Sequence, residues 1–303
     1  MSVVALGPSG NGKTEFFRTI AEAVYGDESR MGMIDMGEML DGTDVTRLLG
    51  ASPKYVGYGQ SILLDKVKPF AEHDETTKVY TVRGVILFDE MDKAHEQVYD
   101  AVMQLLDEGR ITLGNGEVID VSQAVVGFSG NYGTSAMKLG GVGFTAPVAV
   151  ASSETSAPPL TDQLVQGLRV KAKEAWEKAT RTEFRNRVKL VLNFDPLSDE
   201  HLKTLAQRKL DTVLERARTR NKLSISYDDA VLDKVVHFKL DRLKGGRSVT
   251  DNIENLVNSV IEPAVMARKR GTFQLRVSES GDIALGPRTL IVIRGGGADA
   301  LAV

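Results

Sequence analysis

The chain has 303 residues, of which 42% are hydrophobic and 26% charged, and its formal net charge is −3. This composition is ordinary for a soluble globular protein of about two domains, and the slightly acidic balance gives no overall positive field that would attract nucleic acid. Cysteine is absent and no apolar run is long enough to span a membrane, which excludes disulfides, thiol catalysis and a membrane-spanning helix. We expect a cytoplasmic protein, with a mitochondrial or other organelle matrix as the alternative.

The first element that carries chemistry is a glycine-rich loop. Apolar residues at positions 3–6 predict a buried strand, and the spacing of apolar residues after position 15 predicts an amphipathic helix. The loop between them is a complete phosphate-binding pattern and comprises Gly7, Pro8, Ser9, Gly10, Asn11, Gly12, Lys13 and Thr14. In this context backbone N–H groups and the helix N-terminus bind phosphates, Lys13 adds a cation, and the Thr14 hydroxyl can ligate Mg²⁺. The sequence therefore predicts a site for ATP and Mg²⁺.

Short apolar runs alternate with helical patterns over residues 1 to 195, which is typical of a parallel α/β sheet. Strands are predicted at 3–6, 31–35, 85–88, 124–129 and 189–194, and a hairpin is predicted around Asn115-Gly116. After Pro196 the period becomes helical, with a helix over 247–270 that Pro263 should kink or divide, and then a strand pair near 273–277 and 282–285. We predict a nucleotide-binding domain at 1–195, a small helical domain at 196–295 and a flexible tail at 296–303.

Two acidic residues end the predicted strand at 85–88. If this strand lies beside the phosphate-binding loop, Asp89 would hold Mg²⁺, directly or through water. Glu90 would then orient and deprotonate the attacking water as a general base. The alternative is a buried strand that simply meets a polar loop.

Four further segments make the sequence resemble the Clp ATPase family of the AAA+ superfamily, and in particular the second ATPase module of two-ring disaggregases and protease-partner unfoldases. They are residues 50–58 (GASPKYVGY), 89–95 (DEMDKAH), 106–112 (LDEGRIT) and 183–187 (EFRNR). The match follows the family's order over nearly the whole chain. It implies an AAA+ P-loop NTPase core with a parallel sheet, followed by a small, mainly helical lid domain with a short strand pair. It also implies ATP hydrolysis in a ring, most often a hexamer, that moves unfolded polypeptide through a central pore.

The resemblance assigns roles to three more polar residues. Asn131 matches the residue that senses the γ-phosphate and holds the attacking water. Arg187 matches the arginine finger, which reaches the nucleotide of the neighbouring subunit, with Arg185 as the competing candidate. Arg247 matches the arginine by which the lid senses nucleotide. A structural ion pair is the alternative for either of the first two arginines, and a solvated helix end for the third.

Two segments match surfaces that handle other proteins. The family's pore loop, in which an aromatic side chain grips extended polypeptide, matches Tyr55, Val56, Gly57 and Tyr58. Peptidase-partnered relatives carry a glycine–hydrophobe loop that docks on the protease ring, and here it matches Val142, Gly143 and Phe144. A loop that fastens to its own domain is an equally good interpretation of the second segment.

Some features depart from the family. The chain begins at the first predicted strand, whereas relatives have preceding segments that help to enclose the adenine, and residues 72–83 lengthen the stretch before Asp89. Two other functions therefore stay open. One is a non-catalytic or truncated nucleotide-binding subunit that regulates another ring. The other is a nucleic-acid-remodelling AAA+ ATPase, against which the acidic balance argues.

Overall fold

The computed structural model describes residues 1–52, 60–132, 161–242 and 244–287. Within these ranges the chain forms two compact units. The first holds the residues up to Leu197 together with the short segment Asp241–Arg247, and the second holds the residues on either side of that segment. Among the described residues, no helix combines the length and apolarity needed to cross a bilayer.

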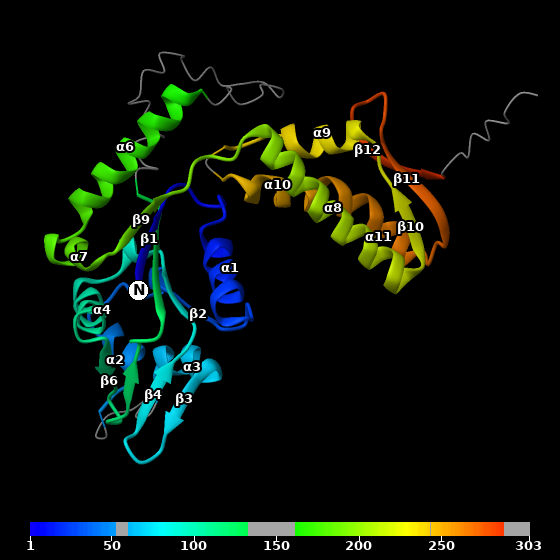
Figure 1. Cartoon of the computed structure of the whole chain (residues 1–303). Helices are drawn as coiled ribbons and strands as arrows, with labels where there is room; N and C mark the ends of the chain where they lie inside the picture. Colours follow the sequence, from blue (N-terminus) through cyan, green and yellow to red (C-terminus); the bar gives the residue numbers. More distant parts are fainter. Residues whose placement is uncertain (53–59, 133–160, 243, 288–303) are drawn as a thin grey trace, which may run out of the picture. The chain divides into compact units, whose positions relative to one another are not determined.

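A parallel five-stranded sheet forms the centre of the first unit, as the sequence predicts (Figure 1). Its order is β2-β5-β8-β1-β9, with bounds β1 Ser2–Leu6, β2 Met31–Asp35, β5 Val85–Asp89, β8 Val125–Gly130 and β9 Leu190–Asn193. All four pairings are parallel. Every residue of β1 is buried, which explains its continuous apolar run. The carboxyl ends of β1, β5 and β8 therefore meet at one edge of the sheet.

Helices cover both faces of this sheet. Their bounds are α1 Lys13–Tyr25, η1 Met36–Glu38, α2 Asp44–Leu49, α3 Ile62–Val67, η2 Lys68–Phe70, η3 Met91–Lys93, α4 Glu96–Glu108, α6 Asp162–Ala179 and α7 Thr182–Arg187. Figure 1 shows α1 on one side of the sheet and α4, α6 and α7 on the other. Successive side chains of a strand point to opposite faces, so Val3 and Ala5 pack with Phe17 of α1, whereas Val4 and Leu6 join the larger core on the other face.

A second, four-stranded sheet lies in the same unit. Its order is β3-β4-β7-β6, with bounds β3 Ala71–Asp74, β4 Val79–Val82, β6 Arg110–Thr112 and β7 Val118–Asp120. Strands β6 and β7 form the hairpin predicted at Asn115-Gly116, where Gly116 has a φ of 86°. Strands β3 and β4 form an antiparallel pair in the stretch that the sequence marks only as a longer connection.

The second unit combines helices with a three-stranded sheet. Its elements are α8 Asp199–Asn221, α9 Asp229–His237, α10 Gly246–Asn252 from Ser248 onward, the π-helical turn η4 Ile253–Asn258, α11 Ser259–Met266, β10 Leu223–Ser226, β11 Gly271–Val277 and β12 Ile283–Pro287. The predicted strand pair forms as β11 and β12, and β10 adds a parallel third strand that the sequence did not predict. Pro263 does not divide the helix, because it lies within α11; the irregular turn is η4, which begins ten residues earlier at Ile253.

Candidate nucleotide-binding site

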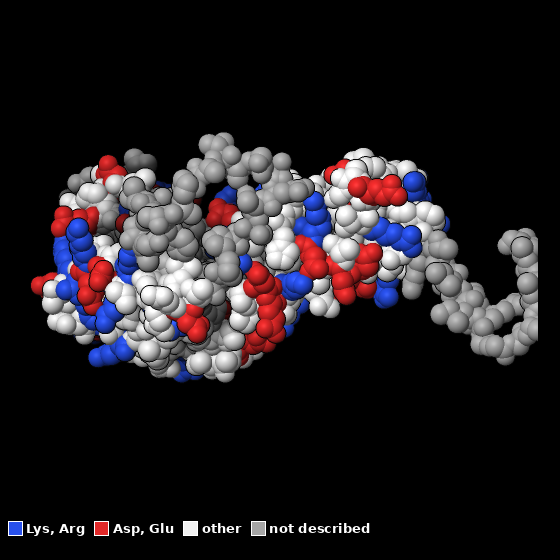
Figure 2. Space-filling model, turned by 90° about the horizontal axis from the view of Figure 1, so that it is seen from above, with Lys and Arg blue, Asp and Glu red and all other residues white. Residues whose placement is uncertain are grey.

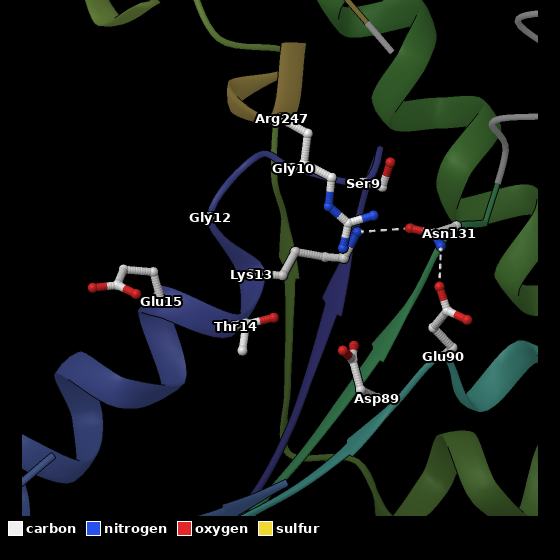
Figure 3. A pocket seen from close by; sticks show the side chains of 10 residues that line it. All are labelled: Ser9, Gly10, Gly12, Lys13, Thr14, Glu15, Asp89, Glu90, Asn131 and Arg247. Carbon is white, nitrogen blue, oxygen red and sulfur yellow. Dashed lines mark hydrogen bonds between the residues drawn. The ribbon is translucent and has the colours of Figure 1, made fainter. Parts of the chain in front are cut away.

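One pocket of the first unit gathers most of the predicted site residues (Figure 3). It lies where the carboxyl ends of β1, β5 and β8 meet, which is where open parallel sheets bind their ligands. Its lining consists of Ser9, Gly10, Gly12, Lys13, Thr14, Glu15, Asp89, Glu90, Asn131 and Arg247. All of these except Glu15 are candidates from the sequence.

The glycines of the loop have two different functions. Gly7 and Gly10 have φ values of 140° and 75°, and a Cβ on either would lie 2.2 Å from the Phe194 carbonyl oxygen or 2.0 Å from that of Lys244. Gly12 begins α1 with a φ of 90°, and a Cβ there would meet no atom within 4 Å. The loop therefore depends on glycine for close packing at two positions and for a left-handed backbone at all three, which is the cradle that a phosphate needs.

Lys13 is buried at the base of this loop. Its Nζ donates to the carbonyl oxygens of Gly7 at 2.7 Å and Pro8 at 2.8 Å, and to Asn131 Oδ1 at 3.0 Å. Burial lowers the pKa of Lys13 from 10.5 to about 8, although Asp89 raises it in part. The ammonium is thus held by neutral oxygens, and an anionic phosphate oxygen would stabilise its charge better than they do.

Asp89 and Thr14 supply the oxygen atoms suited to a magnesium ion. Figure 3 shows the Asp89 carboxylate and the Thr14 hydroxyl directed into the pocket. The buried Ser129 donates a short hydrogen bond from Oγ to Asp89 Oδ1 and accepts one from the Glu90 N–H at 3.3 Å. Hard oxygen donors such as these fit Mg²⁺, so the residues present suit the ion that the phosphate loop implies.

Glu90 is held by donors on both carboxylate oxygens. Asn131 Nδ2 donates to Oε1 at 3.3 Å, and Lys93 Nζ lies 2.5 Å from Oε2. Asn131 therefore bridges Lys13 and Glu90, and its own N–H donates to Asp92 Oδ1 at 3.2 Å. The backbone of Glu90 is left-handed, with a φ of 56°. A carboxylate oriented beside the phosphate loop can accept a proton from a water in the pocket.

Arg247 lines the pocket, and the residue before it is hydrogen-bonded to the backbone of the phosphate loop. The Gly246 N–H donates to the Gly10 carbonyl at 3.0 Å, and a Cβ on Gly245 would lie 2.0 Å from Asn11 Oδ1. Asn11 is buried against this turn, does not line the pocket, and has no hydrogen-bond partner for its amide among the described residues. The contact fixes the segment that carries Arg247 onto the phosphate loop.

Both candidate finger arginines lie away from the pocket. Arg187, at the end of α7, forms an ion pair with Asp107 of α4 and donates to the Glu183 carbonyl at 2.7 Å. Arg185 donates to the carbonyls of Glu177 and Thr180, at the end of α6, and to Thr182 Oγ1 at 3.0 Å. Both arginines thus contact groups of their own subunit: Arg185 caps α6, and Arg187 forms an ion pair, which is the alternative interpretation of this residue.

The structure adds two residues to the site that the sequence did not identify, and some of the predicted residues lie outside the part of the chain that it describes. Ser129 and Lys93 contact the acidic pair directly. The sequence signals for Lys93 were its place in the family-matching segment 89–95 and its position three residues after Glu90, which is the spacing of a helical ion pair. Some candidates lie outside the described residues, namely Tyr55, Val56, Gly57 and Tyr58 of the predicted pore loop and Val142, Gly143 and Phe144 of the predicted peptidase contact.

Known proteins resemble the chain in sequence and in fold. The chaperone protein ClpB of Dichelobacter nodosus is 30% identical over 269 residues, which are 88% of this chain and 27% of that protein. ClpB of Vibrio cholerae is 31% identical over 271 residues, covering 88% of this chain and 28% of that protein. The chain thus spans less than a third of the length of these two relatives.

A solved structure shows the same fold. The chain of a closed-state cryo-EM reconstruction of Hsp104 with ATPγS and FITC casein superimposes with a TM-score of 0.70 at 23% identity, covering 94% of this chain and 44% of that one. The family model described as AAA domain (Cdc48 subfamily) matches residues 1–191. The predicted family and fold are confirmed, and the chain belongs to the AAA domain family, Cdc48 subfamily, as a nucleotide-binding ATPase domain of the Clp type.

Proposed function

We propose that this chain is the ATP-hydrolysing part of a ring-forming protein unfoldase or remodelling chaperone. The observation that carries the proposal is the hydrogen-bonded series Lys13–Asn131–Glu90 beside Asp89 in one pocket. These are the groups needed to bind a triphosphate, hold its metal ion and activate water. The nucleotide-binding family of the chain makes ATP the expected ligand.

Each residue of the pocket has a separate task in this proposal. The loop N–H groups and Lys13 bind the outer phosphates. Thr14 and Asp89 would hold Mg²⁺, which draws electron density from the terminal phosphate when it is bound. Asn131 orients the attacking water, and Glu90 accepts its proton. Arg247, which follows a residue bonded to the loop, lines the same pocket and adds a second cation there.

The proposal includes a ring, most often a hexamer in this family, because Arg187 lies outside the pocket of its own subunit. A guanidinium from a neighbouring subunit would stabilise the charge that spreads over the phosphate in the transition state. Unfolded polypeptide is the proposed substrate, gripped by Tyr55 in the predicted pore loop, and the similarity to Hsp104 solved with FITC casein supports this class of substrate. A cytoplasmic location and a peptidase partner at residues 142–144 stay predictions from sequence.

ATP turnover against protein concentration tests the proposal. We expect the rate per subunit to rise with concentration as rings assemble. Glu90→Gln should lower turnover by about 10²- to 10⁴-fold, since it removes the general base, while ATP still binds. Glu22→Gln makes the same change of charge on an exposed turn of α1 and serves as the control. A rate per subunit that is independent of dilution, or indifferent to Glu90→Gln, would contradict the mechanism.

The other two functions are less well supported. Against a non-catalytic subunit stands Glu90, a carboxylate that lines the same pocket as the phosphate loop and is held there by two donors. On the face shown in Figure 2, acidic and basic side chains are interspersed, and the described residues of that face form no continuous basic stripe of the kind that tracks a nucleic-acid backbone.

A further inference from the structure

The turn after β5 folds a lysine back onto Glu90. The single helical turn η3 follows Glu90 directly and is closed by a hydrogen bond from the Lys93 N–H to the Glu90 carbonyl at 2.9 Å. This turn places Lys93 Nζ 2.5 Å from Glu90 Oε2, with 49% of the Lys93 side chain and 27% of the Glu90 side chain exposed. The ammonium therefore occupies one of the two carboxylate oxygens of the proposed base.

The neighbouring segment η1 leaves room for this arrangement. A Cβ on Gly37 would lie 2.9 Å from Glu90 Oε2 and 2.9 Å from Asp35 Oδ1, so a larger residue at position 37 would push both carboxylates away. Asp35 is itself fixed by the Gly37 N–H at 2.8 Å. The pKa of Lys93 is raised, first by its hydrogen bond to Glu90 and then by the nearby charges of Asp92 and Asp35, so the ammonium stays charged.

Such a pair contributes little to folding, because exposed ion pairs three residues apart are worth at most a few tenths of a kcal/mol. Its effect on geometry is larger. With Oε2 held by Lys93 and Oε1 held by Asn131 Nδ2, the carboxylate plane is fixed from two sides. A carboxylate oxygen accepts more than one hydrogen bond, so Oε1 keeps a lone pair for a water in the pocket.

We propose that Lys93 is a positioning residue for ATP hydrolysis, which holds Glu90 Oε2 so that Oε1 faces the attacking water beside Asn131. This inference rests on the proposed function, in which Glu90 is the general base. Misplacement of a base by a fraction of its hydrogen-bond length lowers the rate of the chemical step without weakening the binding of the nucleotide. The signature of Lys93 is therefore a loss of kcat with an unchanged Kd.

The test compares Lys93→Met, which removes the charge and keeps the length, with Lys93→Arg, which keeps the charge. Steady-state turnover gives kcat and KM for ATP, and titration with a fluorescent ATP analogue gives the Kd. We expect Lys93→Met to lower kcat by about 10- to 100-fold with a Kd within about twofold of wild type, and Lys93→Arg to restore most of the rate. Lys173→Met is the matched control, since Lys173 pairs with Glu177 in an exposed turn of α6.

Two further variants separate the outcomes. In a Glu90→Gln background, Lys93→Met should lower residual turnover no further, because both changes remove the same step. Three outcomes would overturn the role of Lys93 while leaving the proposed function intact. They are a Lys93→Met rate equal to wild type, a parallel loss of kcat and of ATP affinity, and no recovery of the rate in Lys93→Arg. A wild-type chain that does not hydrolyse ATP, or a Glu90→Gln chain as active as wild type, would instead overturn the proposed function.

Discussion

Lys13 Nζ and Asn131 Oδ1 are joined by a hydrogen bond of 3.0 Å, although 118 positions separate the two residues in the sequence. The bond links the start of α1 to the end of β8, and the same amide reaches Glu90 through its nitrogen. The group that binds phosphate and the group proposed to activate water are therefore coupled through one side chain. A substitution at Lys13 or at Asn131 should therefore also change the position of the Glu90 carboxylate.

The buried charge of Lys13 makes the stability of the nucleotide-free protein depend on pH. Because its pKa falls from 10.5 to about 8 on folding, the folded chain binds fewer protons between these values and becomes more stable as the pH rises. The penalty is present in full below pH 8 and disappears towards pH 10.5, and it amounts to roughly 3 kcal/mol. Urea unfolding of wild type and Lys13→Met across this range isolates the effect, and parallel stability curves would contradict it.

Removal of the Ser129 hydroxyl should weaken the proposed magnesium site. Ser129→Ala leaves Asp89 Oδ1 without its donor and the Glu90 N–H without its acceptor, so the carboxylate is free to rotate. We expect the Mg²⁺ concentration for half-maximal ATP turnover to rise about tenfold, since groups that hydrogen-bond to a metal ligand typically contribute that much. Ser259→Ala, an exposed serine of α11, is the control. An unchanged Mg²⁺ requirement would show that Ser129 does not orient Asp89.

The two candidate finger arginines should separate by stability and rate. Arg185→Ala removes the cap of α6 and should lower the free energy of unfolding by about 1–2 kcal/mol. Arg187→Ala should lower turnover by about 10³-fold with little change in stability, as expected for a finger. Thermal unfolding and ATPase assays measure both effects.

Mixing two inactive variants tests whether Arg187 acts between subunits. A Glu90→Gln subunit keeps its Arg187 and can supply it to an Arg187→Ala neighbour whose Glu90 is intact. Equimolar mixtures should therefore recover part of the wild-type turnover. If Arg187 acts on its own subunit, the mixture stays as inactive as its components.

The contact between Gly245 and Asn11 should decide whether Arg247 reaches the nucleotide. Gly245→Ala would place a Cβ 2.0 Å from Asn11 Oδ1 and would displace the segment that carries Arg247. We expect an ATP Kd about tenfold weaker, equivalent to about 1.4 kcal/mol, and no further loss on combination with Arg247→Ala.

Gly281→Ala is the matched control for this change. Gly281 also has a positive φ, of 83°, but a Cβ there would meet no atom within 4 Å. It therefore carries the backbone strain of the substitution without the collision. Equal losses of ATP affinity in Gly245→Ala and Gly281→Ala would refute the importance of the contact.

Close packing between α1 and the sheet should limit substitution at Gly127. A Cβ at this position of β8 would lie 2.4 Å from Cε1 of the fully buried Phe17. Gly127→Ala should therefore cost about 1–3 kcal/mol of stability, as overpacked cores do. Gly286→Ala, where a Cβ would meet nothing within 4 Å, should be close to neutral. Denaturant midpoints compare the two, and equal midpoints would exclude overpacking.

The sequence predicts the centre of the first sheet well because β1, β5 and β8 are buried almost throughout and form nearly continuous apolar runs. The pair β3–β4 escaped prediction since its outer strand Ala71–Asp74 is mostly exposed and polar, and its inner strand has only two buried residues. The four-residue strand β10 follows α8 after a single residue, which leaves no turn signal of its own. Burial, which decides these strands, is a property of the folded chain.

The site divides in the same way. The phosphate loop and the acidic pair can be recognised from the sequence because the residues of each are consecutive, in one run of eight residues and in one pair. Asn131 and Arg247 needed a family resemblance, since nothing near them in sequence shows that they meet Lys13. No sequence signal marked Ser129. Its role as a donor to Asp89 follows only from the pairing of β5 with β8, which places the two side chains together.

The left-handed backbone of Glu90 suggests a compromise between folding and turnover. Asymmetric carbons resist that region by about 1 kcal/mol, and glycine would relieve the penalty. Selection for thermostability alone would therefore favour glycine at position 90 and yield a more stable protein that lacks the proposed general base. Screens for thermostable variants of this chain should accordingly also require phosphate release, because otherwise they will enrich for inactive variants.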